Sequence, residues 1–264
     1  MAAGTVAGCL GALLGLGGGV FLVPLLNIGF GLPLNLAAGV SLLTVIATSS
    51  AVSARSRGQR LVNLRLGMLL QVAASAGGLA GGITVAYLSE RVLYSMFAAV
   101  TAIITVITLS RLDTRNVILD SEVAPNAFGG RYYEEESGRE IVYRVRRLPL
   151  AFAVSLVGGS VSGFLGIGGG ILQVPALNAW CGVPLRAAAA TSAVMIGVTA
   201  VASAPIYFAR GDVAVPLAAA AVLGVLVGSR AGFWFGGRAR AKWLKVLMAA
   251  VLGSVSATYV YKAL

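Results

Sequence analysis

Long apolar segments alternate with short polar ones along nearly the whole chain. Many of them approach or exceed about 20 residues, the length at which an α-helix crosses the hydrocarbon core of a bilayer. The pattern therefore predicts membrane helices, with one long polar stretch at residues 111–147. The apolar runs cover residues 2–14, 20–30, 34–54, 66–88 and 92–109, and then residues 148–165, 171–181, 185–209, 213–235 and 243–261.

The pattern of apolar segments contains an internal repeat, because a glycine-rich motif occurs again in the second half of the chain. Residues 15–27 read GLGGGVFLVPLLN and residues 166–178 read GIGGGILQVPALN, a separation of 151 positions. Pro24 and Pro175 keep the same separation. Two homologous halves in one chain are therefore predicted.

The domain organisation follows from the repeat. We predict a first transmembrane repeat at residues 1–110, a polar linker at 111–147 and a second transmembrane repeat at 148–264. Each repeat begins with two short helical pieces separated by the glycines, and three full transmembrane helices follow. The pattern leaves open whether each glycine-broken hairpin is re-entrant or crosses the membrane twice.

The positions of the basic loops predict how the two repeats are oriented. Lys and Arg mark cytoplasmic loops, and one basic loop, residues 55–60, follows the first long span of its half, whereas the other, residues 238–245, follows the second long span. If both loops are cytoplasmic, equivalent helices run in opposite directions. The fold class is then an all-α polytopic membrane protein of two inverted repeats, with a cytoplasmic linker and both termini external.

The linker itself contains a candidate β-hairpin. Residues 131–134 and 141–145 are rich in aromatic and β-branched side chains, and Ser137 and Gly138 between them are turn formers. A disordered linker is the alternative.

Composition supports a membrane protein and argues against other partners. Hydrophobic residues make up 58% and charged residues 11% of the chain, whereas soluble domains carry about 25% charged residues. The net charge of +11 predicts no nucleic-acid binding, because the basic residues lie between apolar spans. Outside residues 111–147 the acids are Glu90 and Asp212, and we place both in loops.

Catalytic and metal-binding chemistry finds little basis in this sequence. The chain has no His, and its cysteines, Cys9 and Cys181, lack metal-ligand spacing and lie in apolar surroundings. No base stands beside either cysteine in sequence, as nucleophilic catalysis would need. We therefore expect neither an enzyme nor a bound metal or cofactor, and take both cysteines as small buried hydrophobes.

The glycine breaks are the strongest candidates for a binding site. Consecutive glycines expose backbone, which membranes tolerate only where it is buried in protein or lines a cavity. Backbone N–H groups at the start of a half-helix, together with its dipole, favour an anion near the midplane. The alternative is that the glycines only let two helices touch. The candidate residues are Gly17, Gly18, Gly19, Val20, Gly168, Gly169, Gly170 and Ile171.

Polar side chains near the breaks are further candidates for substrate binding. Each also has a structural reading: an amide can join two helices, and a hydroxyl can bond to a carbonyl of its own helix. Arg230 is the strong charge within a span, which suggests a charge partner for the substrate, although its side chain can equally snorkel to the interface. The uncharged candidates are Asn27, Asn178, Ser41, Thr44, Thr191 and Ser192.

The doubled glycine motif with its downstream proline resembles the TauE/SafE family of sulfite-exporter-like permeases. The resemblance covers residues 8–82 and 158–251. It implies transport of sulfite, sulfonates or other sulfur-containing organic anions. Two features depart from the family pattern: residues 58–65 lack the acidic residue common in that loop, and the linker at 111–147 is longer.

The sequence as a whole predicts a secondary transporter for small sulfur-containing anions such as sulfite, sulfonates or sulfoacetate, in the direction of export. Its partners are the anionic substrate and the lipid bilayer, and a homodimer is left open. An anion channel on the same scaffold, or a permease for a non-sulfur organic anion, remains the alternative.

Overall fold

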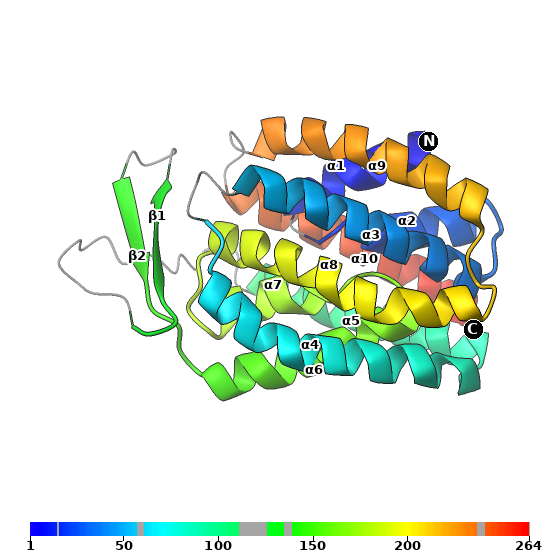
Figure 1. Ribbon diagram of the computed structural model, residues 1–264, viewed down its shortest axis with the longest axis horizontal. Helices are drawn as coiled ribbons and strands as arrows, with labels where there is room; N and C mark the ends of the chain where they lie inside the picture. Colours follow the sequence, from blue (N-terminus) through cyan, green and yellow to red (C-terminus); the bar gives the residue numbers. More distant parts are fainter. Residues whose placement is uncertain (15, 57–60, 111–125, 135–138, 237–240, 264) are drawn as a thin grey trace.

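The computed structural model describes residues 1–14, 16–56, 61–110, 126–134, 139–236 and 241–263. Its helices lie lengthwise beside one another, and a small β-hairpin lies at one end (Figure 1). Within the described residues, six helices are long and apolar enough to cross a membrane. The chain is therefore an all-α polytopic membrane protein, as predicted.

The elements of the first half follow the apolar runs of the sequence. Proline inside a helix removes a backbone donor, and the first broken hairpin continues beyond Pro24 as a π-helical turn. The elements are α1 (Ala2–Leu14), α2 (Gly19–Pro24), η1 (Leu25–Gly29), α3 (Leu34–Ser56), α4 (Leu64–Thr84), η2 (Val85–Tyr87) and α5 (Glu90–Ser110).

The hairpin of the linker follows the first half, and the second half then repeats the helical order. α6 has 18 residues and is one of the six possible spans, whereas its counterpart α1 has 13 residues and is shorter than a span. The elements are β1 (Gly130–Glu134), β2 (Arg139–Tyr143), α6 (Leu148–Leu165), α7 (Gly170–Ala179), α8 (Leu185–Ala209), α9 (Val215–Gly236) and α10 (Ala241–Ala263).

The structure corrects the predicted place of Glu90 and the predicted start of the second hairpin strand, and it confirms that the hairpin exists. Glu90 was expected in a loop but is the first residue of α5, where the positive end of the helix dipole favours a carboxylate. The hairpin is confirmed against disorder, but its second strand begins at Arg139, so that Gly130 pairs with Tyr143. The described residues leave out 57–60 of the first predicted basic loop, much of the linker and 238–240 of the second predicted basic loop.

The two halves exchange packing partners. α1 packs along α9, and α6 packs along α4. A Cβ atom on Gly8 of α1 would meet the carbonyl of Val225, and a Cβ on Gly159 of α6 would meet that of Ala74, so both members of the contact are 151 positions apart. Small residues let helix backbones approach this closely. The same exchange relates the contact of Gly228 with Thr5 to the contact of Gly77 with Leu156. It also relates the contact of Gly232 with Cys9 to the contact of Gly81 with Ser160.

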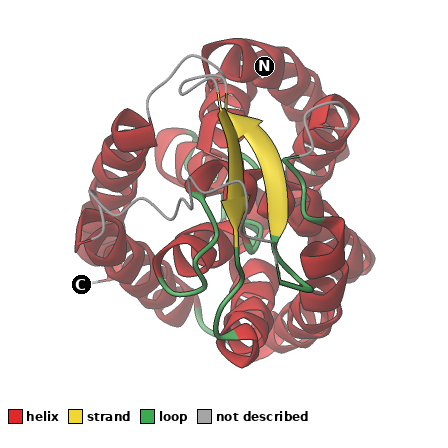
Figure 2. Cartoon of the chain, turned by 90° about the vertical axis from the view of Figure 1, so that its left-hand side faces the viewer, coloured by secondary structure: helices red, strands yellow, loops and turns green. Residues whose placement is uncertain are grey.

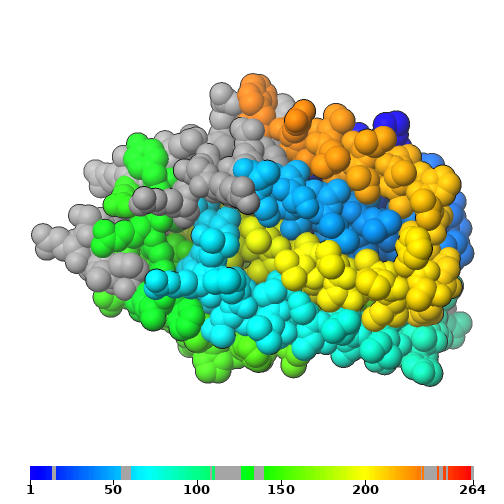
Figure 3. All heavy atoms as spheres, in the orientation of Figure 1, coloured from blue at the N-terminus to red at the C-terminus, as the bar shows by residue number. Residues whose placement is uncertain are grey.

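α3 and α8 lie side by side between α9 and α4, and Figure 3 shows these four helices on one face. The loop after α8 contacts α3 near its start, at Gly39, whereas Ser49, further along α3, donates a hydrogen bond to the Val194 carbonyl of α8 at 3.3 Å. α3 and α8 are therefore antiparallel. α5 and α10 form a second antiparallel pair.

The α5–α10 pair is held by an aromatic and a polar contact. Phe97 of α5 stacks on Tyr259 of α10 with ring centroids 4.4 Å apart. Ser256 donates to the Ala98 carbonyl at 3.0 Å. The residue number rises along one helix as it falls along the other, which fixes their opposite directions.

The β-hairpin lies across one end of the helical bundle (Figure 2). Asn63, just before α4, donates to the Phe128 carbonyl at 2.7 Å and to the Tyr143 hydroxyl at 3.1 Å. Burial raises the pKa of the Tyr143 hydroxyl, and the hydrogen bond with Asn63 lowers it by less. Both chain termini lie at the opposite end of the bundle (Figure 1).

Candidate substrate site at the paired helix breaks

Both helix breaks are built from glycines with left-handed backbone. Gly17 has φ +77° between α1 and α2, and Gly168 has φ +76° between α6 and α7. Residues with a Cβ atom rarely adopt these φ angles. Gly18 has φ +76°, whereas its counterpart Gly169 is in the right-handed helical region with φ −63°. The two breaks thus differ in backbone conformation at equivalent positions, Gly18 in the first and Gly169 in the second.

The two breaks meet near the middle of α3 and α8. A Cβ atom on Gly17 or on Gly168 would contact both Val45 of α3 and Ile196 of α8, which are themselves 151 positions apart. Val45 Cγ1 would be 3.4 Å from the first and 3.3 Å from the second. Val45 and Ile196 are both fully buried. These side chains fill the space between the breaks.

The breaks also touch each other directly. Ser41 Oγ, from α3, donates to the Gly166 carbonyl at 2.7 Å. A Cβ atom on Gly19, the first residue of α2, would lie 2.9 Å from the Ile167 carbonyl. The first glycine break and the second are therefore in one place, although they are far apart in sequence.

The first backbone N–H groups of α2 and α7 lie at this meeting point, because each half-helix begins at its break. The first internal bonds of α2 run from Phe21 and Leu22 to the Gly18 carbonyl, and those of α7 from Leu172 and Gln173 to that of Gly169. The N–H groups before them are left without intrahelical partners, as at every helix N-terminus. They belong to Gly19, Val20, Gly170 and Ile171, which are all buried.

No charged side chain of the described residues is buried, so the electrostatics of the breaks come from backbone dipoles. Each helix N-terminus is equivalent to about half a positive charge. The two termini together offset about one negative charge. This environment suits a single small anion.

Asn27 and Asn178 lie away from the breaks, at the far ends of the half-helices. Asn27 Nδ2 donates to the Leu32 carbonyl at 2.8 Å, and Asn178 Nδ2 donates to the Val183 carbonyl at 3.0 Å. The donors and the acceptors are each 151 positions apart. Both amides therefore bind the loop that ends their own hairpin.

The hydroxyl candidates divide between the breaks and other contacts. Ser41 bonds to the second break, as described, and Ser192 Oγ donates to Gln173 Oε1 at 3.1 Å. Thr44 Oγ1 donates to the Ser41 carbonyl of its own helix at 2.7 Å. Thr191 Oγ1 accepts from the backbone of Asn63 at 2.9 Å, on the side of α8 that faces α4.

Arg230 is exposed on the surface of α9, six residues before the helix ends at Gly236. An exposed side chain at this position agrees with snorkelling. The structure does not bring Arg230 to the breaks.

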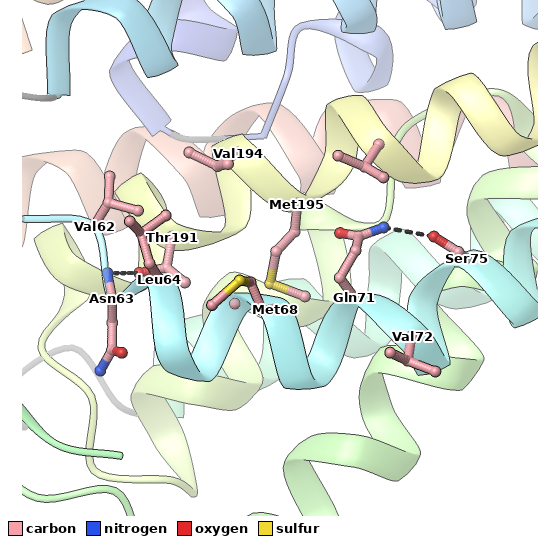
Figure 4. Close-up of a pocket in the computed structure, with 12 residues that line it drawn as sticks. Val62, Asn63, Leu64, Met68, Gln71, Val72, Ser75, Thr191, Val194 and Met195 are labelled. Carbon is pink, nitrogen blue, oxygen red and sulfur yellow. Dashed lines mark hydrogen bonds between the residues drawn. The ribbon is translucent and has the colours of Figure 1, made fainter. Parts of the chain in front are cut away.

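A groove of about 320 Å³ lies elsewhere, between α4 and α8 (Figure 4). Met68 and Val72 on its rim are 65% and 68% exposed, so the groove opens sideways on the outer surface of the bundle. Among the sequence candidates only Thr191 lines it, and its walls are mainly apolar. In a bilayer this groove faces lipid.

Two polar residues that the sequence did not single out become prominent in the structure. Gln173 is buried beside the second break. Lys262, near the end of α10, donates to Asn27 Oδ1 at 2.8 Å and lies 5.3 Å from the centre of the Tyr94 ring. Gln173 could have been found by comparing the two motif copies, because its counterpart is Leu22.

Comparison with known proteins places this architecture among membrane transporters, which take a small-molecule substrate. The chain belongs to the family described as Sulfite exporter TauE/SafE, whose pattern matches residues 1–259.

Two relatives carry transporter names. The probable membrane transporter protein YunE of Bacillus subtilis (strain 168) is 26% identical over 270 residues, which cover 98% of this chain and 95% of that protein. A probable membrane transporter protein of Methanocaldococcus jannaschii is 23% identical over 265 residues, covering 95% and 90%. No solved structure matches the chain.

Proposed function

We propose that this transporter carries small sulfur-containing monoanions, such as hydrogen sulfite or simple sulfonates, out of the cell. The observation that carries the proposal is the meeting of two helix N-termini in buried, uncharged surroundings. Helix N-termini bind anions through free N–H groups and the helix dipole. The substrate-binding residues in this proposal are Gly17, Gly18, Gly19, Val20, Gly168, Gly169, Gly170 and Ile171, with Ser41 and Ser192 beside them.

Charge balance favours one negative charge on the substrate. The two N-termini together offset about one elementary charge. A second charge would be buried without compensation, which is costly in an apolar interior. Hydrogen sulfite and simple sulfonates meet this condition, whereas sulfate and sulfoacetate, which each carry two negative charges at neutral pH, do not. Sulfur itself is suggested by the family's description.

The two halves act, in this proposal, as inverted repeats around the anion. Support comes from two helix pairs, α3 with α8 and α5 with α10. The members of each pair are equivalent in the repeat and run antiparallel to each other. A two-fold axis that exchanges antiparallel helices lies perpendicular to them, and hence in the membrane plane. Transporters of this kind bind substrate at the repeat interface near the midplane.

The orientation in the membrane is inferred from the basic loops. Lys and Arg concentrate on the cytoplasmic side, so residues 55–60, 238–245 and the linker at 111–147 are assigned to the cytoplasm. The termini lie at the end of the bundle opposite the hairpin, which supports external termini. Export then means movement from the hairpin end toward the end with the termini.

A carrier fits the described residues better than an open channel. Val45 and Ile196 close the space between the breaks, and both are fully buried. An anion reaches the N-termini only after these side chains move. Alternating access by movement of one repeat against the other would supply that motion.

The test is a flux assay with purified protein in proteoliposomes, using sulfite, methanesulfonate, sulfoacetate, sulfate and acetate. We expect saturable flux and counterflow for the monovalent anions hydrogen sulfite and methanesulfonate, and weak flux of the divalent sulfate and sulfoacetate. Non-saturating flux without counterflow would indicate a channel. Preference for acetate would indicate a permease for other organic anions.

A matched pair of variants locates the site. Gly168→Ala places a Cβ between Val45 and Ile196 at φ +76°, whereas Gly211→Ala places one at the same φ in open space. Both variants carry similar backbone strain, so a difference in transport reports the space at the break. We expect loss of flux in Gly168→Ala only. Equal flux in the two variants would remove the break from the substrate path.

A further inference from the structure

The two breaks are not chemically equal, because one of them carries a buried amide. Gln173, in the first turn of α7, is 1% exposed. Its Oε1 accepts a hydrogen bond from Ser192 Oγ at 3.1 Å. Its Nε2 has no hydrogen-bond partner among the described residues. One end of this amide is fixed and the other is an unused donor.

The unused donor points to the start of α7. Gln173 Nε2 lies 3.4 Å from the position that a Cβ atom on Gly169 would take. Gly169 is the residue before α7, and the free N–H groups of Gly170 and Ile171 follow it. Backbone and side-chain donors therefore gather at one helix end, and α7, with ten residues, is long enough to carry a dipole.

The first break lacks this donor. The position equivalent to Gln173 is Leu22, which is fully buried. Ser41, equivalent to Ser192, donates to the Gly166 carbonyl instead of to an amide. The first break thus presents an apolar wall where the second presents an N–H₂ group.

A buried polar group without a hydrogen bond costs stability. At the equivalent position of the other half, a leucine, Leu22, is fully buried. A buried N–H₂ group of Gln173 without a partner is explained if a bound ligand supplies the acceptor for its hydrogen bond.

We propose that the transported anion binds asymmetrically, at the second break, with one oxygen on Gln173 Nε2 and another on the N–H groups of Gly170 and Ile171. This inference rests on the proposed function and specifies its site. The ligand class is a small oxoanion with at least two acceptor oxygens on one centre, as in a sulfonate or sulfite. Ser192 is a positioning residue, because it holds the amide by its oxygen and so turns the N–H₂ group toward the break.

The test compares anion binding by the purified parent protein and by three variants, with radiolabelled sulfite and methanesulfonate as probes. Gln173→Leu copies the first break into the second. Gln173→Glu has nearly the same shape but replaces the donor with an acceptor. Gln71→Leu is the control, because Gln71 is an amide on α4 that bonds to Ser75 at 2.7 Å, away from the breaks.

We expect Gln173→Leu to weaken binding by about 10- to 100-fold, the range for one hydrogen bond to a charged group. Gln173→Glu should abolish binding at neutral pH, and Gln71→Leu should bind as the parent does. Without anion, the thermal midpoint of Gln173→Leu should equal or exceed that of the parent, because a buried unsatisfied donor has been removed. A purely structural role for Gln173 would lower the midpoint instead.

The outcomes separate this inference from the proposed function. If the parent binds and transports the probes and Gln173→Leu binds them equally well, the asymmetric site is wrong and the proposed function stands. If the parent binds neither probe and transports no member of the anion panel, the proposed function fails and this inference fails with it. A lower thermal midpoint of Gln173→Leu with unchanged affinity also overturns the asymmetric site.

Discussion

Replacing Gly19 by alanine tests the contact between the two breaks without straining the backbone. Gly19 is outside the set of glycines with positive φ, so alanine fits its backbone conformation. The added Cβ would lie 2.7 Å from Ser41 Oγ and 2.9 Å from the Ile167 carbonyl. Both distances are too short for a methyl group, so Ser41 and the second break must move away.

The structure sets the size of this effect. Overpacking in a closed interior costs about 1–3 kcal/mol, and losing the bond from Ser41 to Gly166 costs about 0.5–1.5 kcal/mol. Replacing a glycine by alanine returns about 0.4–1 kcal/mol through the unfolded state. The net penalty on the closed arrangement is about 1–3 kcal/mol. If transport passes through this arrangement, flux falls about 5- to 150-fold.

Gly29→Ala is the matched control, because a Cβ on Gly29 meets nothing within 4 Å and its φ is also not positive. We expect anion flux in proteoliposomes and the thermal midpoint in detergent to fall for Gly19→Ala and to stay near the parental values for Gly29→Ala. Parental flux and an unchanged midpoint in Gly19→Ala would refute the close contact between the breaks.

Two further predictions concern the hairpin end and the membrane orientation. Burial raises the pKa of the Cys181 thiol to about 11, and the opposing effect of the Arg147 charge is smaller. In a variant without the other cysteine, alkylation of Cys181 should therefore be slow at neutral pH and accelerate as the pH approaches that value. Labelling at pH 8 as fast as in the denatured protein would contradict this. Single cysteines introduced at positions 57 and 240 should react with impermeant reagents from the cytoplasmic side, and a single cysteine at position 211 should react from the outside. Labelling of positions 57 and 240 from opposite sides would contradict the inverted repeat.

Much of the fold could be predicted because hydrophobicity and repetition act locally. α1, α6 and α8 begin and end with their apolar runs. The exchange of packing partners between the halves could not be predicted in this way. Helices that are apolar all round show no amphipathic face that would identify a neighbour, so the pairing of Gly8 with Val225 and of Gly159 with Ala74 became visible only in three dimensions.

The candidate site was predictable to a similar extent. The repeated glycines indicated two breaks, but a motif does not reveal that Ser41 bonds across to Gly166 or that Val45 and Ile196 separate the glycines. Gln173 was overlooked because a search for similarity between the motif copies passes over the positions where they differ.

The driving force is inferred from the lack of His and of any carboxylate in the interior of the spans, since Glu90 stands at the very first residue of α5. The chain has no His, and its acids outside residues 111–147 are Glu90 and Asp212. Glu90 begins α5, and Asp212 forms an ion pair with Arg210 at 3.4 Å in the loop after α8. We therefore propose that the anion crosses with its own charge. An inside-negative potential favours its exit by about 2.3 kcal/mol per 100 mV.

The most direct test of anion transport through the paired breaks is flux under an imposed membrane potential. Proteoliposomes without a pH or sodium gradient are loaded with methanesulfonate, and valinomycin with a potassium gradient sets the potential. Our account predicts that an inside-negative potential drives the anion out, that reversing the potential reverses the flux, and that Gly168→Ala abolishes both movements. Flux that ignores the potential but stops when a pH or sodium gradient is collapsed would contradict it.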